Sequence, residues 1–111
     1  MSRAVIAGPD DEELGAALEA AGFTVTRAAG TATRPALEEA GIVDADLLVL
    51  TDTDLSTSIP IAKDLNEDVR TVVYAADSLP EFVKGQADML LDPGLFDPGD
   101  VAAELAADGE E

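Results

Sequence analysis

The fold is decided by the stretch Asp46-Leu47-Leu48-Val49-Leu50-Thr51-Asp52-Thr53-Asp54. Its four consecutive apolar residues form the most hydrophobic run of the chain, with polar residues on both sides. A short apolar run bounded by turn-forming residues is typical of a buried strand. We therefore expect residues 46–51 to form a strand near the centre of a sheet.

Four further strands are predicted around this stretch. The apolar run at 4–7 closes with Gly8-Pro9, and the other short strands are expected at 23–26, 71–74 and 89–91. Helices are expected from a cap at Asp10 or Asp11 to Ala21, and over 35–41, 56–65, 80–84 and 97–107. Strands that alternate with helices favour right-handed crossovers. The predicted fold is α/β: a small Rossmann-like parallel sheet of about five strands with helices on both faces.

The length of 111 residues fits one domain, which we place at residues 1–107, with an acidic frayed tail at 108–111. The chain carries 24 acidic and 6 basic residues, for a net charge of −18. Lys and Arg supply most contacts to nucleic-acid phosphates and anionic lipids, so neither partner is expected. No apolar run is long enough for membrane insertion. Acids spread along the whole chain predict a cytoplasmic protein adapted to high salt.

The residue types that are missing exclude several kinds of chemistry. The chain has no His and no Cys, which excludes imidazole bases, thiolate nucleophiles, zinc fingers and disulfides. Ser78 stands four residues after Tyr74, so the Tyr-x-x-x-Lys pair of short-chain dehydrogenases is absent, and there is no P-loop. We predict no catalytic residues and no resident metal ligands, and we do not expect an enzyme.

Ligands of such sheets bind outside the carboxyl ends of the strands, here residues 8–11, 51–54 and 76–78. Gly8 and Gly15 supply part of a dinucleotide fingerprint, in which glycines allow a tight turn and close packing. The middle glycine is absent, and Arg27 lies near the position of the ribose-binding acid. The fingerprint is therefore degenerate.

Two segments carry a resemblance to a known family. The stretch 37–51 contains Ala40-Gly41-Ile42 and Asp44-Ala45-Asp46 before its strand, and 85–93 contains Gly85-Gln86-Ala87-Asp88 and a closing Pro93. Both resemble the TrkA-N family, the RCK-type NAD-binding regulatory domain of potassium-transport systems. The resemblance implies a non-enzymatic regulatory module with NAD or another nucleotide as cofactor. It implies a homodimer, or a subunit of a transporter or enzyme. The matching positions for cofactor contact are Gly8, Pro9, Asp10, Gly15, Thr51 and Asp52.

Two alternative functions stay open. The first is a degenerate Rossmann domain that acts as a protein-interaction subunit without nucleotide. The second is a Mg²⁺-dependent switch, because the chain also resembles response-regulator receiver domains, with acids after the first strand and an Asp at the end of the third. Asp10, Asp11 and Asp52 would hold the cation. Asp92 precedes Pro93 where the receiver family has Lys, which is unfavourable for a phosphoryl group.

Overall fold

The computed structural model describes residues 2–9, 13–28, 33–75 and 87–108. Five parallel strands form one sheet in the order β2-β1-β3-β4-β5. The strands are β1 (Arg3–Ala7), β2 (Thr24–Ala28), β3 (Leu47–Leu50), β4 (Arg70–Tyr74) and β5 (Met89–Leu91). The helices are α1 (Leu14–Ala20), α2 (Arg34–Glu39), α3 (Ser58–Leu65) and α5 (Pro98–Asp108), with short 3₁₀ turns at Ile42–Asp44 and Thr53–Leu55.

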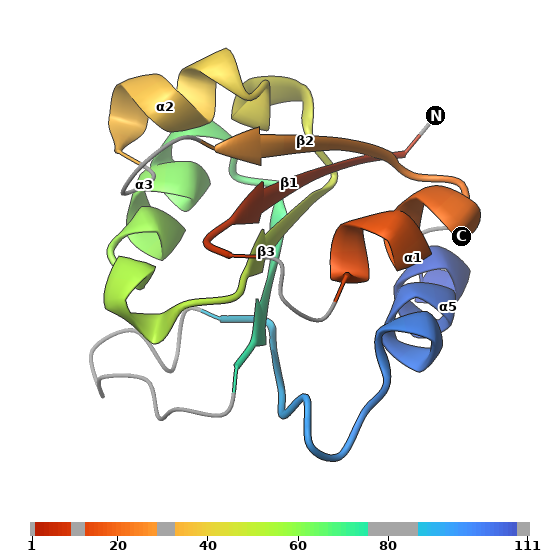
Figure 1. Ribbon diagram of the computed structural model, residues 1–111. Helices are drawn as coiled ribbons and strands as arrows, with labels where there is room; N and C mark the ends of the chain where they lie inside the picture. Colours follow the sequence, from red (N-terminus) through yellow and green to blue (C-terminus); the bar gives the residue numbers. More distant parts are fainter. Residues whose placement is uncertain (1, 10–12, 29–32, 76–86, 109–111) are drawn as a thin grey trace.

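Helices cover both faces of the sheet (Figure 1): α2 and α3 lie on one face, and α1 and α5 pack together on the other. The central strand β3 is fully buried, as its sequence predicts. Its side chains alternate between the two layers, so Leu48 and Leu50 join the core under α2 and α3. Leu47 and Val49 join the core under α1 and α5. The predicted α/β fold class is confirmed.

The strand order decides where the crevice of the sheet lies. β1 pairs with β2 on one side and with β3 on the other, and Ala7 is in register with both Ala28 and Leu50. This is the flavodoxin-like order 2-1-3-4-5, whereas dinucleotide-binding Rossmann sheets place the third strand beyond the second. The order therefore reverses between β1 and β3. Ligands of such sheets bind above this switch point, which is flanked by Gly8 and Thr51.

The starts of α1 and α3 can be compared with the starts that the sequence predicts. α1 begins at Leu14, and its N-cap is Glu13 in the left-handed conformation, at φ 59° and ψ 36°, without a side-chain cap. The predicted cap at Asp10 or Asp11 is therefore wrong, and both residues lie outside the described residues. α3 begins at Ser58 and holds Pro60 in its first turn, where proline is tolerated.

The predicted helix at 80–84 lies outside the described residues. No helix in the described part of the chain is long and apolar enough to cross a membrane.

Candidate functional site

The candidate site lies at the carboxyl ends of β1 and β3, where the loops after both strands meet. Thr51 directly follows β3, and its backbone N–H donates a hydrogen bond to the carbonyl oxygen of Ala7 at 3.0 Å. Its hydroxyl also donates to that carbonyl at 3.3 Å. Thr51 therefore extends the pairing of β1 and β3 by one residue and has its hydroxyl turned toward the β1 backbone.

Gly8 is the glycine that this approach requires. Its φ of +107° lies in a region that L side chains rarely adopt. A Cβ atom at this position would lie 2.5 Å from Thr51 Oγ1 and 3.2 Å from both the Cβ and the backbone nitrogen of Asp52. The absence of a side chain at Gly8 thus allows close packing against the β3 loop.

The six predicted contact residues fall into two groups. The structure brings Gly8, Thr51 and Asp52 together at the switch point. Pro9 is exposed beside them, Gly15 is buried in α1, and Asp10 lies outside the described residues. The role of these positions in binding a ligand remains a prediction.

Of the three carboxylates predicted to hold Mg²⁺, only Asp52 lies among the described residues of this edge. Mg²⁺ needs near-octahedral oxygen ligands and is usually held by one or two carboxylates. Thr51 turns its hydroxyl to Ala7, and the described residues contain no group of three or more acidic, His or Cys side chains that would hold a metal. Asp10 and Asp11 lie outside the described residues, so their cluster with Asp52 stays a prediction.

The carboxyl end of β5 carries an acid that is used in a turn. Asp92 Oδ1 accepts a hydrogen bond from the Gly94 backbone N–H at 2.8 Å, and the Asp92 carbonyl accepts from the backbone N–H groups of Leu95 and Phe96. The buried Tyr74 at the end of β4 donates its hydroxyl to the carbonyl of Phe96 at 2.6 Å. The loop after β5 is therefore fixed, and it places a carboxylate, not a cation, at this position.

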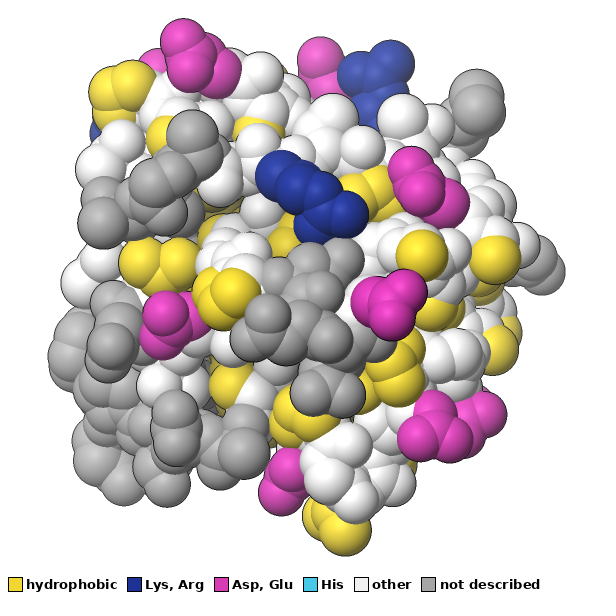
Figure 2. All heavy atoms as spheres, viewed as in Figure 1, with side chains coloured by type: hydrophobic (Ala, Val, Ile, Leu, Met, Phe, Trp, Pro, Cys, Tyr) yellow, Lys and Arg dark blue, Asp and Glu magenta, His cyan; other side chains and the backbone are white. Residues whose placement is uncertain are grey.

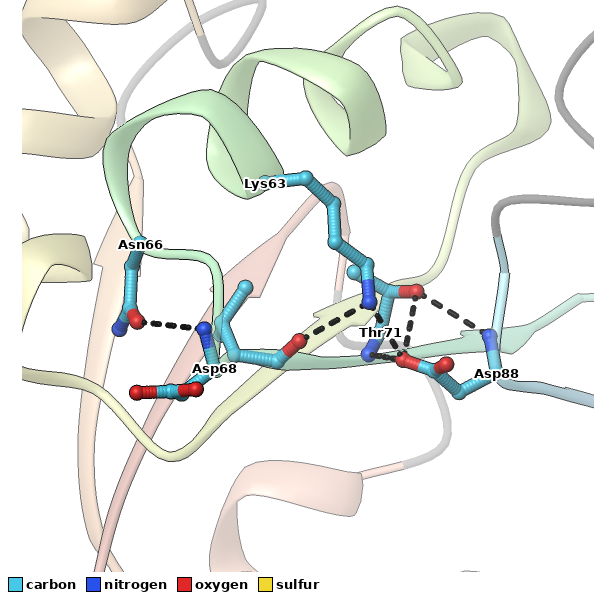
Figure 3. A network of polar contacts seen from close by, with 6 residues as sticks. Lys63, Asn66, Asp68, Thr71 and Asp88 are labelled. Atoms are coloured by element: carbon cyan, nitrogen blue, oxygen red, sulfur yellow. Dashed lines mark hydrogen bonds and ion pairs between the residues drawn. The ribbon is translucent and has the colours of Figure 1, made fainter.

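A polar network that the sequence analysis missed lies at the opposite end of β4 and β5 (Figure 3). Asp88 Oδ2 accepts hydrogen bonds from the Thr71 backbone N–H at 2.8 Å and from Lys63 Nζ at 2.9 Å. Lys63 also donates to the Val69 carbonyl. Partial burial raises the pKa of Asp88, but the Thr71 amide and Lys63 more than offset it, so the pKa lies below its usual 3.8.

The position of this network indicates a structural role. It ties α3 to β4 and to the residue before the edge strand β5, far along the strands from the switch point. The only sequence signal was the scarcity of lysine, because Lys63 is one of two in the chain. Periodicity does not indicate which of 24 acids it meets.

Comparison with known proteins identifies the family of this chain. The model of a family of unknown function (DUF7126) matches residues 4–105, so the chain belongs to that family. A search of curated proteins gives no match.

Solved structures of similar fold include receiver domains. A response regulator receiver domain protein (CheY-like) from Methanospirillum hungatei JF-1 is 18% identical with a TM-score of 0.71, over 97% of this chain and 93% of that one. An orphan response regulator of H. pylori is 17% identical with a TM-score of 0.68, over 96% and 95%. A Burkholderia thailandensis protein assigned to pilus assembly (cpaE) is 19% identical with a TM-score of 0.70, over 100% of both chains.

These findings correct two predictions. The TrkA-N assignment is wrong, because the matching family model is DUF7126 and the structural neighbours include receiver domains. The prediction of NAD or another nucleotide as cofactor rested on that assignment and is wrong as well. The physical reason is the strand order, since β3 lies beside β1 and not beyond β2 as in dinucleotide-binding sheets.

Proposed function

We propose that this DUF7126 member is a regulatory module of receiver fold that acts by binding a protein partner, without an aspartyl-phosphate step. The observation that carries the proposal is the closed contact between Gly8 and the loop after β3. A side chain at position 8 would collide with Thr51, so this position offers no carboxylate to a cation. The module keeps the fold of its structural neighbours, while its Gly8 backbone packs directly against Thr51 and Asp52.

The charge at this edge supports the proposal. Transfer of a phosphoryl group depends on cations that neutralise the charge on its oxygens. Here Asp92 stands where a receiver domain has Lys, and its carboxylate binds Gly94. The acidic side chains also outnumber the cationic ones on the face that Figure 2 shows. An added phosphoryl group would meet like charge.

A protein partner fits the remaining features. We further propose a salt-rich cytoplasm as the setting, supported by the net charge of −18. A second copy of the chain and a transporter or enzyme subunit are the partner types proposed from the sequence. Sedimentation of the pure chain tests the first of these, because only self-association raises the mass in a pure sample.

The test is incubation of the full chain with a small-molecule phosphodonor and Mg²⁺, followed by mass spectrometry and amide NMR. The proposal expects no mass increase, and no amide shifts at Gly8, Thr51 or Asp52 beyond those caused by Mg²⁺ alone. Incorporation of one phosphoryl group that is lost in Asp52→Asn would overturn it. A matched control is Asp68→Asn, at an exposed aspartate outside the crevice.

The second candidate function is the Mg²⁺-dependent receiver-like switch. It is favoured by the position of Asp52, which is the second residue after β3, lies beside Gly8 and is partly exposed. The same labelling experiment decides for it, because this candidate requires a phosphoryl group on Asp52 and dependence on the divalent cation.

A further inference from the structure

Exposed apolar side chains are concentrated at one edge of the sheet. Four large apolar side chains are exposed among the described residues, and three of them lie between positions 90 and 96. Leu95 is 78% exposed, Leu90 51% and Phe96 43%. Leu95 and Phe96 are adjacent and form one exposed apolar patch, whereas Leu90 points to the other face of β5 from Met89 and Leu91.

Next to Phe96, a groove of about 540 Å³ lies between the edge strand β5 and α5. Its apolar lining comes from Met89, Leu91, Phe96 and Val101. This volume is within the range of about 300–1,000 Å³ of typical binding pockets. In Figure 2, hydrophobic and acidic side chains alternate at the lower right, in the region of α5 and the loop before it in Figure 1.

The loop that carries Leu95 and Phe96 is held in place. Its turn is closed by two backbone hydrogen bonds to the Asp92 carbonyl, at 2.9 and 3.0 Å. The hydroxyl of the buried Tyr74 binds the Phe96 carbonyl at 2.6 Å. The apolar side chains are therefore presented by a fixed backbone, and a preorganised loop loses less conformational entropy when a partner binds.

The wall of the groove on α5 is acidic. Asp100 and Glu104 line it and stand four residues apart, on one face of the helix. A second copy of this chain would bring the same acids and another net charge of −18 to the interface. Charge complementarity favours a positively charged occupant.

We propose that the β5–α5 groove binds a basic amphipathic segment of a partner protein. The apolar side chains of the segment enter between Met89 and Val101, and its Lys or Arg side chains meet Asp100 and Glu104. This is the general arrangement of an amphipathic helix in an apolar groove. The inference rests on the proposed function, because it names the partner chemistry of the regulatory module.

The test uses the full chain and a synthetic peptide with leucines on one helical face and lysines on the other. A peptide of the same composition in scrambled order is the control. Amide NMR should show shifts at 89–104 with the amphipathic peptide. Phe96→Ser, at a side chain that lines the groove and is 43% exposed, should weaken binding by about tenfold. Val43→Ser, at a residue 54% exposed on a 3₁₀ turn, should leave binding unchanged.

The charged wall has its own matched variants. Asp100→Asn with Glu104→Gln should weaken the peptide several-fold at about 0.1 M KCl and have little effect at about 2 M, where charges are screened. Glu38→Gln with Glu39→Gln, on α2, should not show this salt-dependent loss.

Three results would overturn the inference. These are equal binding of the scrambled peptide, shifts outside the groove, and self-association of the chain that Phe96→Ser abolishes. The last result would identify a second copy as the occupant. Phosphoryl labelling of Asp52 overturns the proposed function whatever the peptide does. If the peptide does not bind and Asp52 is not labelled, only the inference about the groove is overturned.

Discussion

Replacing Gly8 by alanine tests how closely position 8 packs against the loop after β3. The new Cβ would lie 2.5 Å from Thr51 Oγ1, at a φ of +107°. The left-handed backbone costs about 1–2 kcal/mol for a non-glycine residue. Overpacking against the β3 loop costs about 1–3 kcal/mol more. We expect Gly8→Ala to lower the free energy of unfolding by roughly 2–5 kcal/mol, measured by urea denaturation at fixed KCl.

Gly22 supplies a matched control for the backbone part of this cost. Its φ is +106°, and a Cβ there would meet nothing within 4 Å. Gly22→Ala should therefore lose only the backbone contribution, about 1–2 kcal/mol. Thr51→Ala in the Gly8→Ala background removes the nearest atom and should recover part of the difference. Equal losses in the two single glycine variants would refute the argument that position 8 is closed by contact with Thr51.

Three further predictions concern the rest of the molecule. Asp88→Asn should destabilise the chain by about 1 kcal/mol at pH 7, a value discounted because the Asp88 side chain is 46% exposed. Folding lowers the pKa of Asp88, so this stabilisation is present above the pKa of the unfolded chain and is lost as the pH falls through the pKa of the folded chain. The urea midpoints of the wild type and Asp88→Asn should therefore converge in acid. Glu67→Gln is the control. Tyr74→Phe should cost about 1 kcal/mol and broaden the amide signals of the Phe96 loop, and unchanged signals would contradict a fixed loop. Lowering KCl from about 2 M to about 0.1 M should lower the Tm by circular dichroism, because the Debye length grows to about 10 Å around a chain of charge −18.

Most of the fold follows from local patterns. Two elements can be predicted without information from elsewhere in the chain. They are β3, from its apolar run at Leu47–Leu50, and the start of α3, from the proline in its first turn. The start of α1 does not follow in this way. Acids in a run suggest a cap, but the chain enters the helix through Glu13 at positive φ. This entry is a property of the whole β1–α1 connection.

The strand order was beyond the reach of those patterns, and the TrkA-N assignment failed for that reason. An apolar strand that an Asp precedes and a Thr follows satisfies any parallel sheet, because each strand needs only a buried body and polar ends. Whether β3 pairs with β1 or lies beyond β2 depends on contacts between residues more than 40 positions apart, such as Ala4 with Leu47. The resemblance of residues 37–51 to the TrkA-N family therefore reflected one strand and the segment before it.

The β5–α5 groove and the exposed apolar side chains near it could not be predicted from the sequence for a related reason. Leu90, Leu95 and Phe96 are of the same residue types as the buried Leu and Phe residues of the core. They are exposed because β5 is an edge strand of three residues and because Tyr74 holds the following loop by its Phe96 carbonyl. A hydroxyl at the end of β4 thus stabilises the exposed position of an apolar side chain beside β5. If the groove binds a partner, Tyr74→Phe should weaken that binding without changing any residue that lines the groove.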